Sequence, residues 1–201
     1  NIALYLSEAL KSPMVASRVS RLVYDCNRPP EAASAMPEKS KLIEVPGNQN
    51  LTEAQRQART DKFYVPFCDA VSEVVQARKA AGLQTVLITI HSFTPVYYGQ
   101  QRAVEIGILH DDDSAMANAM LAHADLLPNR RVERNEPYGP QDGVTHSLQI
   151  HGLAHDLANV MIEVRNDLVH TPEDETAMAK ELLTLIRPAL ADLAKRGDSN
   201  A

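Results

Sequence analysis

Three groups of polar residues in this 201-residue chain follow short apolar runs that have the composition of β-strands. Ligands in α/β proteins gather outside the carboxyl ends of strands, so polar side chains at those ends are the first candidates for a site. The groups are Asn27 with Arg28, His91 alone, and Glu163 with Arg165 and Asn166.

His91 and Glu163 have the side chains best suited to catalysis. A neutral imidazole can bind a metal ion or transfer a proton, although a capping or packed histidine is the more common outcome. Strand alternation places Glu163 and Arg165 on the face opposite Val160, Ile162 and Val164. A carboxylate within an apolar run is costly unless it is paired, so Glu163 either lies in a site beside a cation or pairs with Arg165 on an exposed face. Both alternatives stay open.

Arg28 can bind a substrate carboxylate, because a guanidinium donates two parallel hydrogen bonds to it. The alternative is an ion pair between Arg28 and Asp25. One further signal is weaker. His151 and His155 lie four residues apart but lack the glutamate that a zinc metalloprotease motif has after its first histidine.

Composition excludes several classes of protein. Hydrophobic residues make up 44% of the chain, yet no apolar run approaches the roughly 20 residues that a membrane helix needs. The net charge of −6 and the scattered basic residues argue against a nucleic-acid partner. Only two cysteines occur, Cys26 and Cys68, which favours packed thiols and a reducing cytoplasm over a disulfide scaffold.

The spacing of apolar residues predicts alternating helices and strands. In the first half we expect a helix ending near residue 11, a short strand at 21–25 and a long surface loop at 31–50 that is a candidate lid. Thr52 and Gln55 form a capping-box pattern that begins a helix reaching towards Gly82, and Pro66 should interrupt it.

The second half continues the alternation. We expect a central strand at 85–90, a strand at 104–109, a helix beginning at 112–114, a helix at 146–157, a strand at 160–164 and a final helix from Pro172 to about Lys195. This order predicts a three-layer α/β/α fold with a mixed, largely parallel sheet, and we expect one domain over residues 1–201.

Five blocks of sequence together resemble the N-formylglutamate amidohydrolase family. They are SRLVYDCNRPP (residues 20–30), IEVPGNQNLT (43–52), TIHSFTPVYYG (89–99), NEPYGPQDGVTHSL (135–148) and VMIEVRNDLV (160–169). This family is related to zinc carboxypeptidases and aspartoacylase-like deacylases. The resemblance therefore implies a phosphorylase/hydrolase-like α/β/α fold and metal-assisted hydrolysis of an amide beside a carboxylate, as in N-formylglutamate deformylation during histidine degradation.

The resemblance also implies a role for each candidate. His91 matches a zinc ligand, and Glu163 matches the carboxylate that deprotonates water and then protonates the leaving amine. Arg21 resembles the arginine that polarises the scissile carbonyl in the aspartoacylase-like relatives. Asn27 and Arg28 match the pair that binds the substrate carboxylate, whereas Arg165 and Asn166 lie in a matching block without so clear a role.

One departure concerns the metal. Family members carry an upstream histidine segment with the remaining zinc ligands, and here no histidine precedes His91. A catalytic zinc commonly has three protein ligands, so we expect the others upstream of Asn1. The partner implied is a small N-acyl amino acid, with no nucleic acid and no membrane; the oligomeric state is left open. The alternatives are a metal-free carboxylate-binding domain and an amidase for another N-acyl amino acid.

Overall fold

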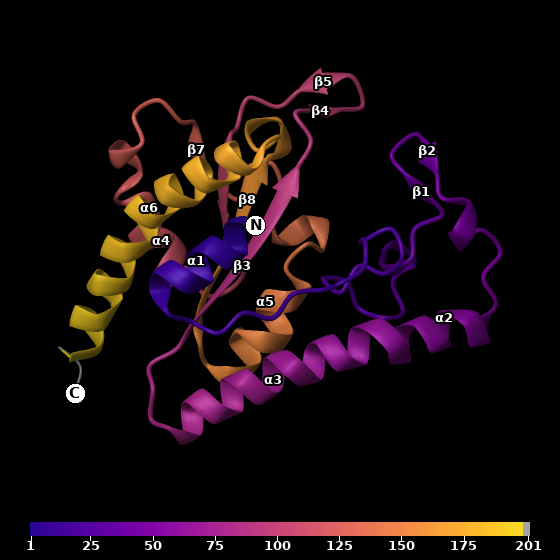
Figure 1. Ribbon diagram of the computed structural model, residues 1–201, viewed down its shortest axis with the longest axis horizontal. Helices are drawn as coiled ribbons and strands as arrows, with labels where there is room; N and C mark the ends of the chain where they lie inside the picture. The colour runs from indigo at the N-terminus through magenta and orange to yellow at the C-terminus, as the bar shows by residue number, and fades with distance from the viewer. Residues whose placement is uncertain (199–201) are drawn as a thin grey trace. The chain divides into compact units, whose positions relative to one another are not determined.

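A computed structural model describes residues 1–198, which cluster into two compact units. The sheet unit combines residues 1–14 with the chain from residue 86 onward, and the helix unit spans residues 15–85. Figure 1 shows the helices and strands of the chain, coloured from the N-terminus to the C-terminus. The prediction that both form one domain stays a prediction.

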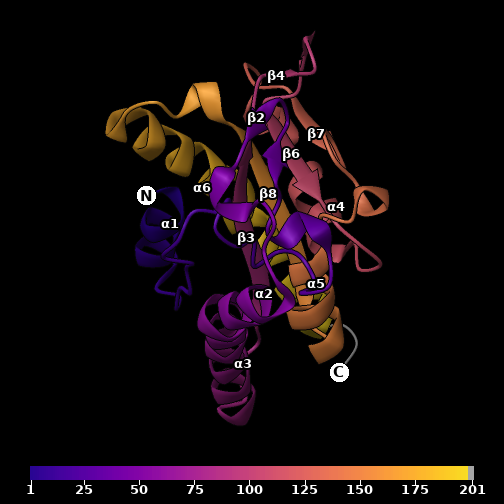
Figure 2. The same cartoon turned by 90° about the vertical axis from the view of Figure 1, so that its right-hand side faces the viewer.

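Four strands form the central sheet of the sheet unit. Figure 2 shows them in the order β3 (Val86–Phe93), β8 (Ala158–Arg165), β6 (Ile106–Leu109) and β7 (Val132–Arg134). β3 and β8 are parallel, as are β6 and β7, whereas β6 and β8 are antiparallel. The predicted mixed, largely parallel sheet is thus confirmed. The strand expected at 85–90 is confirmed as β3, but its expected central position is wrong, because β3 lies at the edge of this sheet and is half-buried while β8 is buried between two neighbours.

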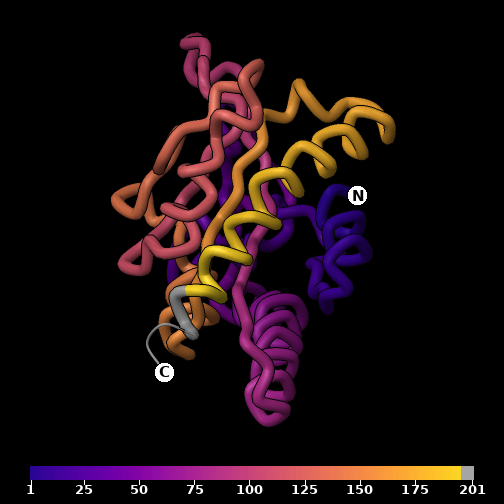
Figure 3. Tube along the Cα trace, turned by 90° about the vertical axis from the view of Figure 1, so that its left-hand side faces the viewer, coloured from indigo at the N-terminus to yellow at the C-terminus, as the bar shows by residue number. Residues whose placement is uncertain are grey.

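One face of the sheet packs against three helices. They are α1 (Ile2–Leu10), α4 (Ala115–Leu121) and α6 (Pro172–Asp198), and α1 lies beside α6 (Figure 3). Alternate residues of the strands, including Val160, Ile162 and Val164, join the helices in the largest apolar core. The strand alternation predicted for residues 160–164 is confirmed, and so are the helices expected near residues 2–11, from 112–114 and from Pro172.

The opposite face is covered by α5 (His146–His151) and a smaller apolar cluster. Leu109 and Met161 of the sheet pack there with Val144 and Leu148. Helices on both sides of one sheet confirm the three-layer α/β/α fold. The single helix expected at 146–157 is two shorter ones, because α5 ends at Gly152 and a 3-10 helix, Leu153–His155, follows.

Shorter elements complete the sheet unit. A hairpin of β4 (Val96–Tyr97) and β5 (Gln100–Gln101) follows β3. Three further 3-10 helices are Ala124–Leu126, Pro140–Asp142 and Asn166–Leu168. β7 was not expected from the sequence, since three residues are too few to show a period.

The helix unit contains a long helical segment in three parts. α2 (Glu53–Arg59) begins with the predicted capping box: Gln55 N donates to Thr52 Oγ1 at 3.2 Å, and Thr52 N donates to Gln55 Oε1 at 2.9 Å. A π-helical stretch, Thr60–Tyr64, precedes α3 (Val65–Ala80), whose first turn holds Pro66. The interruption expected at Pro66 is therefore confirmed, since proline cannot donate the backbone hydrogen bond that a continuous helix needs.

One expectation for the helix unit is wrong. Residues 21–23 form a turn and residues 24–25 are irregular instead of a strand, because Val23 N bonds back to Ser20 O at 2.8 Å. The segment 31–50 is mostly exposed, as expected of a surface loop, and it also holds 3-10 helices at Ala33–Ala35 and Pro46–Asn48 and a short hairpin of β1 (Lys39–Ser40) and β2 (Ile43–Glu44). The buried amide of Asn48 donates to Leu22 O at 2.7 Å and Pro37 O at 2.8 Å, and so fixes this segment within its unit. Its role as a lid stays a prediction.

Both cysteines lie in the helix unit as free thiols. Burial raises the pKa of Cys26 to about 11, and it also raises the pKa of Cys68. Thiols with raised pKa values stay protonated at neutral pH, which supports packing over nucleophilic roles.

None of the helices within residues 1–198 combines the length and the apolarity needed to span a bilayer.

Candidate active site

His91 and Glu163 lie opposite each other on neighbouring parallel strands. They are register partners of β3 and β8, so their side chains leave the same face of the sheet, about 5 Å apart at the backbone. Glu163 is 6% exposed, and His91 is half-buried. Both belong to the face that α5 covers, because the alternate positions, such as Ile162, point into the large apolar core. A buried carboxylate and an imidazole thus share one small region.

On β6, the strand on the other side of Glu163 from His91, a glycine lets a loop approach the same region closely. Gly107 of β6 is the register partner of Glu163. A Cβ atom at Gly107 would lie 1.9 Å from the carbonyl oxygen of Glu136, so only glycine allows the backbone there to come so close. Asn135 fixes this loop, since its N donates to Ile108 O at 3.1 Å and its Oδ1 accepts from His110 N at 2.9 Å.

An arginine surrounded by aromatic rings lies just beyond the end of β3. The Cζ atom of Arg102 is 4.3 Å from the ring centroid of Tyr97, 4.7 Å from that of Tyr138 and 5.6 Å from that of Phe93. Arg102 Nη1 donates to Tyr138 Oη at 2.9 Å. Phe93 and His91 share one strand face, so this aromatic cage adjoins the His91–Glu163 pair.

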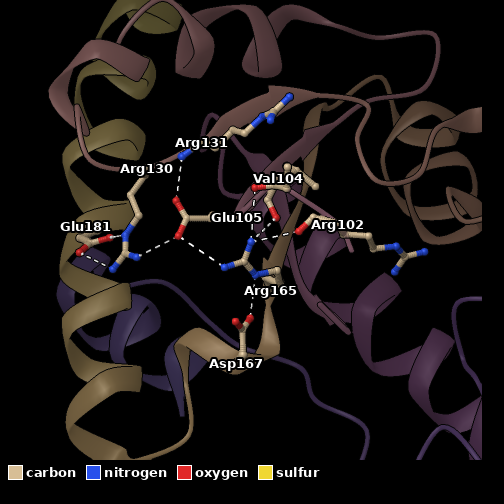
Figure 4. Close-up of polar contacts among 9 residues, drawn as sticks. Arg102, Val104, Glu105, Arg130, Arg131, Arg165, Asp167 and Glu181 are labelled. Atoms are coloured by element: carbon tan, nitrogen blue, oxygen red, sulfur yellow. Dashed lines mark hydrogen bonds and ion pairs between the residues drawn. The ribbon is translucent and has the colours of Figure 1, made fainter. Parts of the chain in front are cut away.

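Arg165 ties the start of β6 to the end of β8 (Figure 4). Its Nε donates to Asp167 Oδ1 at 2.8 Å, and its Nη2 lies 3.7 Å from Glu105 Oε1. Its Nη1 faces the carbonyl oxygens of Arg102, Ala103 and Val104 at 3.1, 3.3 and 3.4 Å. These contacts occupy the guanidinium and position the backbone of residue 102.

Other charged groups extend this network away from the site. Arg130 pairs with Glu105 at 3.4 Å and with Glu181 of α6 at 2.7 Å. Asn166 opens the short 3-10 helix after β8 and is half-buried. Substrate contact by Arg165 and Asn166 stays a prediction.

The remaining candidates lie together in the helix unit, around Asp25. Arg21 donates to Asp25 Oδ2 from Nε at 3.1 Å and from Nη2 at 2.9 Å, and Asp25 Oδ1 accepts from Asn27 N at 3.0 Å. The ion-pair partner of Asp25 is thus Arg21, and the alternative pairing of Asp25 with Arg28 is wrong. Arg28 instead donates from Nη1 to Asn27 O at 2.7 Å. One carboxylate thus organises the turn that carries Arg21, Asn27 and Arg28.

The structure therefore forms two groups, each within its own unit. His91, Glu163, Arg165 and Asn166 lie in the sheet unit, and Arg21, Asn27 and Arg28 lie in the helix unit. The sequence did not single out Gly107, Arg102 or Tyr138. The signals available for them were a glycine within an apolar strand and an arginine following a pair of tyrosines.

The described residues do not form a zinc site by themselves. Among the side chains that the structure describes, residues 1–195, no three or more of His, Cys, Asp or Glu gather closely enough to hold a metal ion. His91 and Glu163 are two such side chains, whereas a catalytic zinc commonly has three protein ligands.

Comparison with known proteins decides the family. The sequence model of N-formylglutamate amidohydrolases matches residues 3–170. The chain belongs to the N-formylglutamate amidohydrolase family. This is a family of amide-hydrolysing enzymes, so the expected enzyme class, an amidohydrolase acting on linear amides, is confirmed together with the resemblance.

Two solved structures extend the comparison. A gene product of Agrobacterium tumefaciens is 54% identical, with a TM-score of 0.93 over 96% of this chain and 76% of its own. An N-formylglutamate amidohydrolase from Ralstonia eutropha is 23% identical, with a TM-score of 0.51 over 73% of this chain and 56% of its own. At that identity the second likeness concerns the fold alone. No curated protein matches the chain.

Proposed function

We propose that this member of the family hydrolyses the amide bond of an N-formyl, or another small N-acyl, acidic amino acid. The substrate that we propose is N-formyl-L-glutamate, with glutamate and formate as products. The observation that carries the proposal is the register pairing of His91 with Glu163 in a chain of this family. An imidazole able to bind a metal ion and a carboxylate able to transfer a proton therefore face one region.

Glu163 is the proton-transfer group in this proposal. Its carboxylate accepts a proton from a water molecule while the water oxygen attacks the formyl carbon. When the carbon–nitrogen bond breaks, the same carboxyl delivers that proton to the leaving amine nitrogen. A group in this position is 6% exposed, so bulk water does not compete strongly for the proton.

Arginines supply the charge complementarity in this proposal. Arg21 would stabilise the negative charge that develops on the carbonyl oxygen. Asn27 and Arg28 would bind a substrate carboxylate, and the short segment that holds them is already ordered around Asp25. Arg165 and Asn166 would act beside Glu163, with Arg165 positioning the neighbouring backbone.

Zinc is a separate part of the proposal. We propose His91 as one ligand of a single divalent metal, with the other ligands outside the described residues. Zinc lowers the pKa of bound water to about 7 where it is present. A cytoplasmic location, suited to the two free thiols, and a place in histidine degradation belong to the same proposal.

The test uses the full-length protein and two matched carboxylates. Glu163→Gln should lower kcat for N-formyl-L-glutamate by about 10²–10⁴-fold, the usual contribution of general acid–base catalysis, with little change in KM. Glu133→Gln, on β7 of the same sheet, is the control and should retain turnover. Unchanged turnover in Glu163→Gln would remove Glu163 from the mechanism.

Metal content and substrate range separate the alternatives. Near-stoichiometric zinc in the full-length protein supports the metal-dependent hydrolase. A metal-free protein that binds glutamate without turnover supports a carboxylate-binding domain. A panel of N-acyl amino acids identifies the acyl group, and preference for a cationic amino acid would contradict the role given to Arg28.

A further inference from the structure

The aromatic cage around Arg102 holds a guanidinium whose charge is not neutralised within the described residues. No Asp or Glu between residues 1 and 195 lies within ion-pair distance of Arg102, whereas Arg130 and Arg165 of the same unit are both paired with carboxylates. Three rings stabilise the cation through their π faces and fix its place. Rings stabilise a cation without using its hydrogen-bond donors, so the guanidinium can still bind an anion.

The hydrogen bonds of Arg102 leave one edge of the fork available. Nη1 donates to Tyr138 Oη at 2.9 Å and faces Thr94 O at 3.5 Å. In the part of the chain that the structure describes, Nε and Nη2 donate to no acceptor. These two nitrogens form the edge that binds a carboxylate through two parallel bonds.

The backbone beneath Arg102 is fixed from two sides. Arg102 N donates to Pro95 O at 2.7 Å across the β4–β5 hairpin. Arg165 Nη1 holds the carbonyl oxygens of residues 102–104 (Figure 4). A guanidinium on a fixed backbone and within a fixed cage loses little conformational freedom when it binds a ligand.

The position of Arg102 matches the length of the proposed substrate. β3 and β8 are parallel, so their carboxyl ends lie at one edge of the sheet, and the hairpin carrying Arg102 follows β3 there (Figure 1). Phe93, which contacts Arg102, lies two residues beyond His91, or roughly 7 Å along the strand. The formyl carbon and the side-chain carboxylate of N-formylglutamate are five bonds apart, roughly 6 Å when extended.

We infer that Arg102 is a specificity-determining residue that binds the side-chain carboxylate of the N-acyl acidic amino acid. This inference rests on the proposed function and adds to it a residue in the same unit as His91 and Glu163. Tyr138 and the cage are positioning residues, because they act on the carboxylate through the guanidinium.

The kinetic test compares substrates that differ only in this charge. N-formyl-L-glutamine replaces the side-chain carboxylate by an amide of the same shape. In the full-length protein, Arg102→Gln should lower kcat/KM for N-formyl-L-glutamate by about 10–100-fold and change that for N-formyl-L-glutamine by less than about 3-fold. Arg102→Lys keeps the charge but loses the fork, and should retain part of the preference.

Two controls separate recognition from folding. Arg134→Gln removes an exposed arginine of β7 in the same unit and should leave the preference unchanged. Tyr138→Phe keeps the ring but removes the hydroxyl that holds Nη1, and should weaken the preference less than Arg102→Gln does. Melting temperatures identify any variant that merely unfolds.

A binding measurement distinguishes failure of this inference from failure of the proposed function. Calorimetry with L-glutamate and L-glutamine needs no turnover, and the wild-type protein should bind L-glutamate at least about 10-fold more tightly. Loss of that preference in Arg102→Gln supports the inference even if the protein hydrolyses no N-acyl amino acid. A preference unchanged in Arg102→Gln, or absent from the wild-type protein, overturns the inference, whereas turnover of N-formyl-L-glutamate would still support the function.

Discussion

The two faces of the central sheet are built from the same strands and differ in composition. On the face beneath α1, α4 and α6, the inward residues of β8 are Val160, Ile162 and Val164, all fully buried. On the face beneath α5, the alternate positions include Met161, which packs in the smaller apolar cluster, and the buried carboxylate of Glu163. A shift of one residue thus exchanges an aliphatic face for a mixed one, because strand side chains alternate.

Within β8, this difference places the residues that stabilise the fold on one face and the residue proposed for catalysis on the other. The aliphatic face excludes water and contributes most of the buried apolar surface of the unit. The α5 face holds a buried carboxylate and a glycine, neither of which adds apolar packing. Functional sites commonly cost a protein some stability. Substitutions on the aliphatic face should therefore lower stability and spare turnover, whereas Glu163→Gln on the α5 face should lower turnover and spare stability.

The largest expected change in stability lies on the aliphatic face. Ile162→Ala removes a fully buried side chain and leaves a cavity, and it should lower the free energy of unfolding by about 3–4 kcal/mol. The folded fraction should keep its kcat, because Ile162 points away from Glu163. Chemical denaturation and turnover per folded molecule measure the two effects. Loss of turnover in the folded protein would contradict the separation of the faces.

A smaller loss is expected at the glycine beside Glu163. Gly107→Ala forces a methyl group towards the carbonyl oxygen of Glu136, so the loop must move, at a cost of about 1–3 kcal/mol. Because the displaced loop adjoins Glu163, kcat/KM should also fall. Denaturation paired with kinetics tests this, and a variant with reduced stability but unchanged kinetics would show that the loop only packs the face.

Protonation of a buried histidine should also distinguish the α5 face. His151 of α5 is 3% exposed, and burial first, then the nearby His146 and His155, lowers its pKa to about 4. In the unfolded chain a histidine titrates near 6.5, so between pH 6.5 and pH 4 the unfolded state binds more protons. Stability is therefore fully present above about pH 6.5 and is lost as the pH falls towards 4, by up to about 3 kcal/mol.

Denaturation measured at several pH values tests this effect. His151→Gln removes the titrating group, so the loss of stability between pH 6.5 and pH 4 should become smaller. An equal loss in the variant and the wild-type protein would assign the pH dependence to other groups.

The sequence predicted the parts of this arrangement that depend on local pattern. The alternation within β8 and the capping box at Thr52 follow from residues a few positions apart, and both are confirmed. The edge position of β3 depends on strands far away in the sequence, which a local pattern does not identify. The turn at 21–23 is local, closed by Val23 N and Ser20 O, but the apolar composition of the run indicated a strand. Among the candidate side chains, the register that pairs His91 with Glu163 is likewise long-range.

The cage around Arg102 shows the same limit. Its rings come from Phe93, Tyr97 and Tyr138, and the last is 36 residues from Arg102 in the sequence. The block NEPYGPQDGVTHSL carried the family resemblance, but a match between blocks assigns no contact to a single tyrosine. Contacts of this kind depend on how the loop folds over Gly107, and that is set by tertiary packing.

The smallest change in stability is expected at the residue with the largest effect on turnover. Glu163→Gln keeps the size and shape of a buried side chain and creates no cavity, so at pH 7 the free energy of unfolding should change by less than about 1 kcal/mol. Beside it on the same strand, Ile162→Ala should do the reverse. Chemical denaturation of both variants at one pH makes the comparison direct. A loss above about 2 kcal/mol in Glu163→Gln would mean that the α5 face depends on this carboxylate for its folding, and the two faces would then differ in polarity without dividing stability from catalysis.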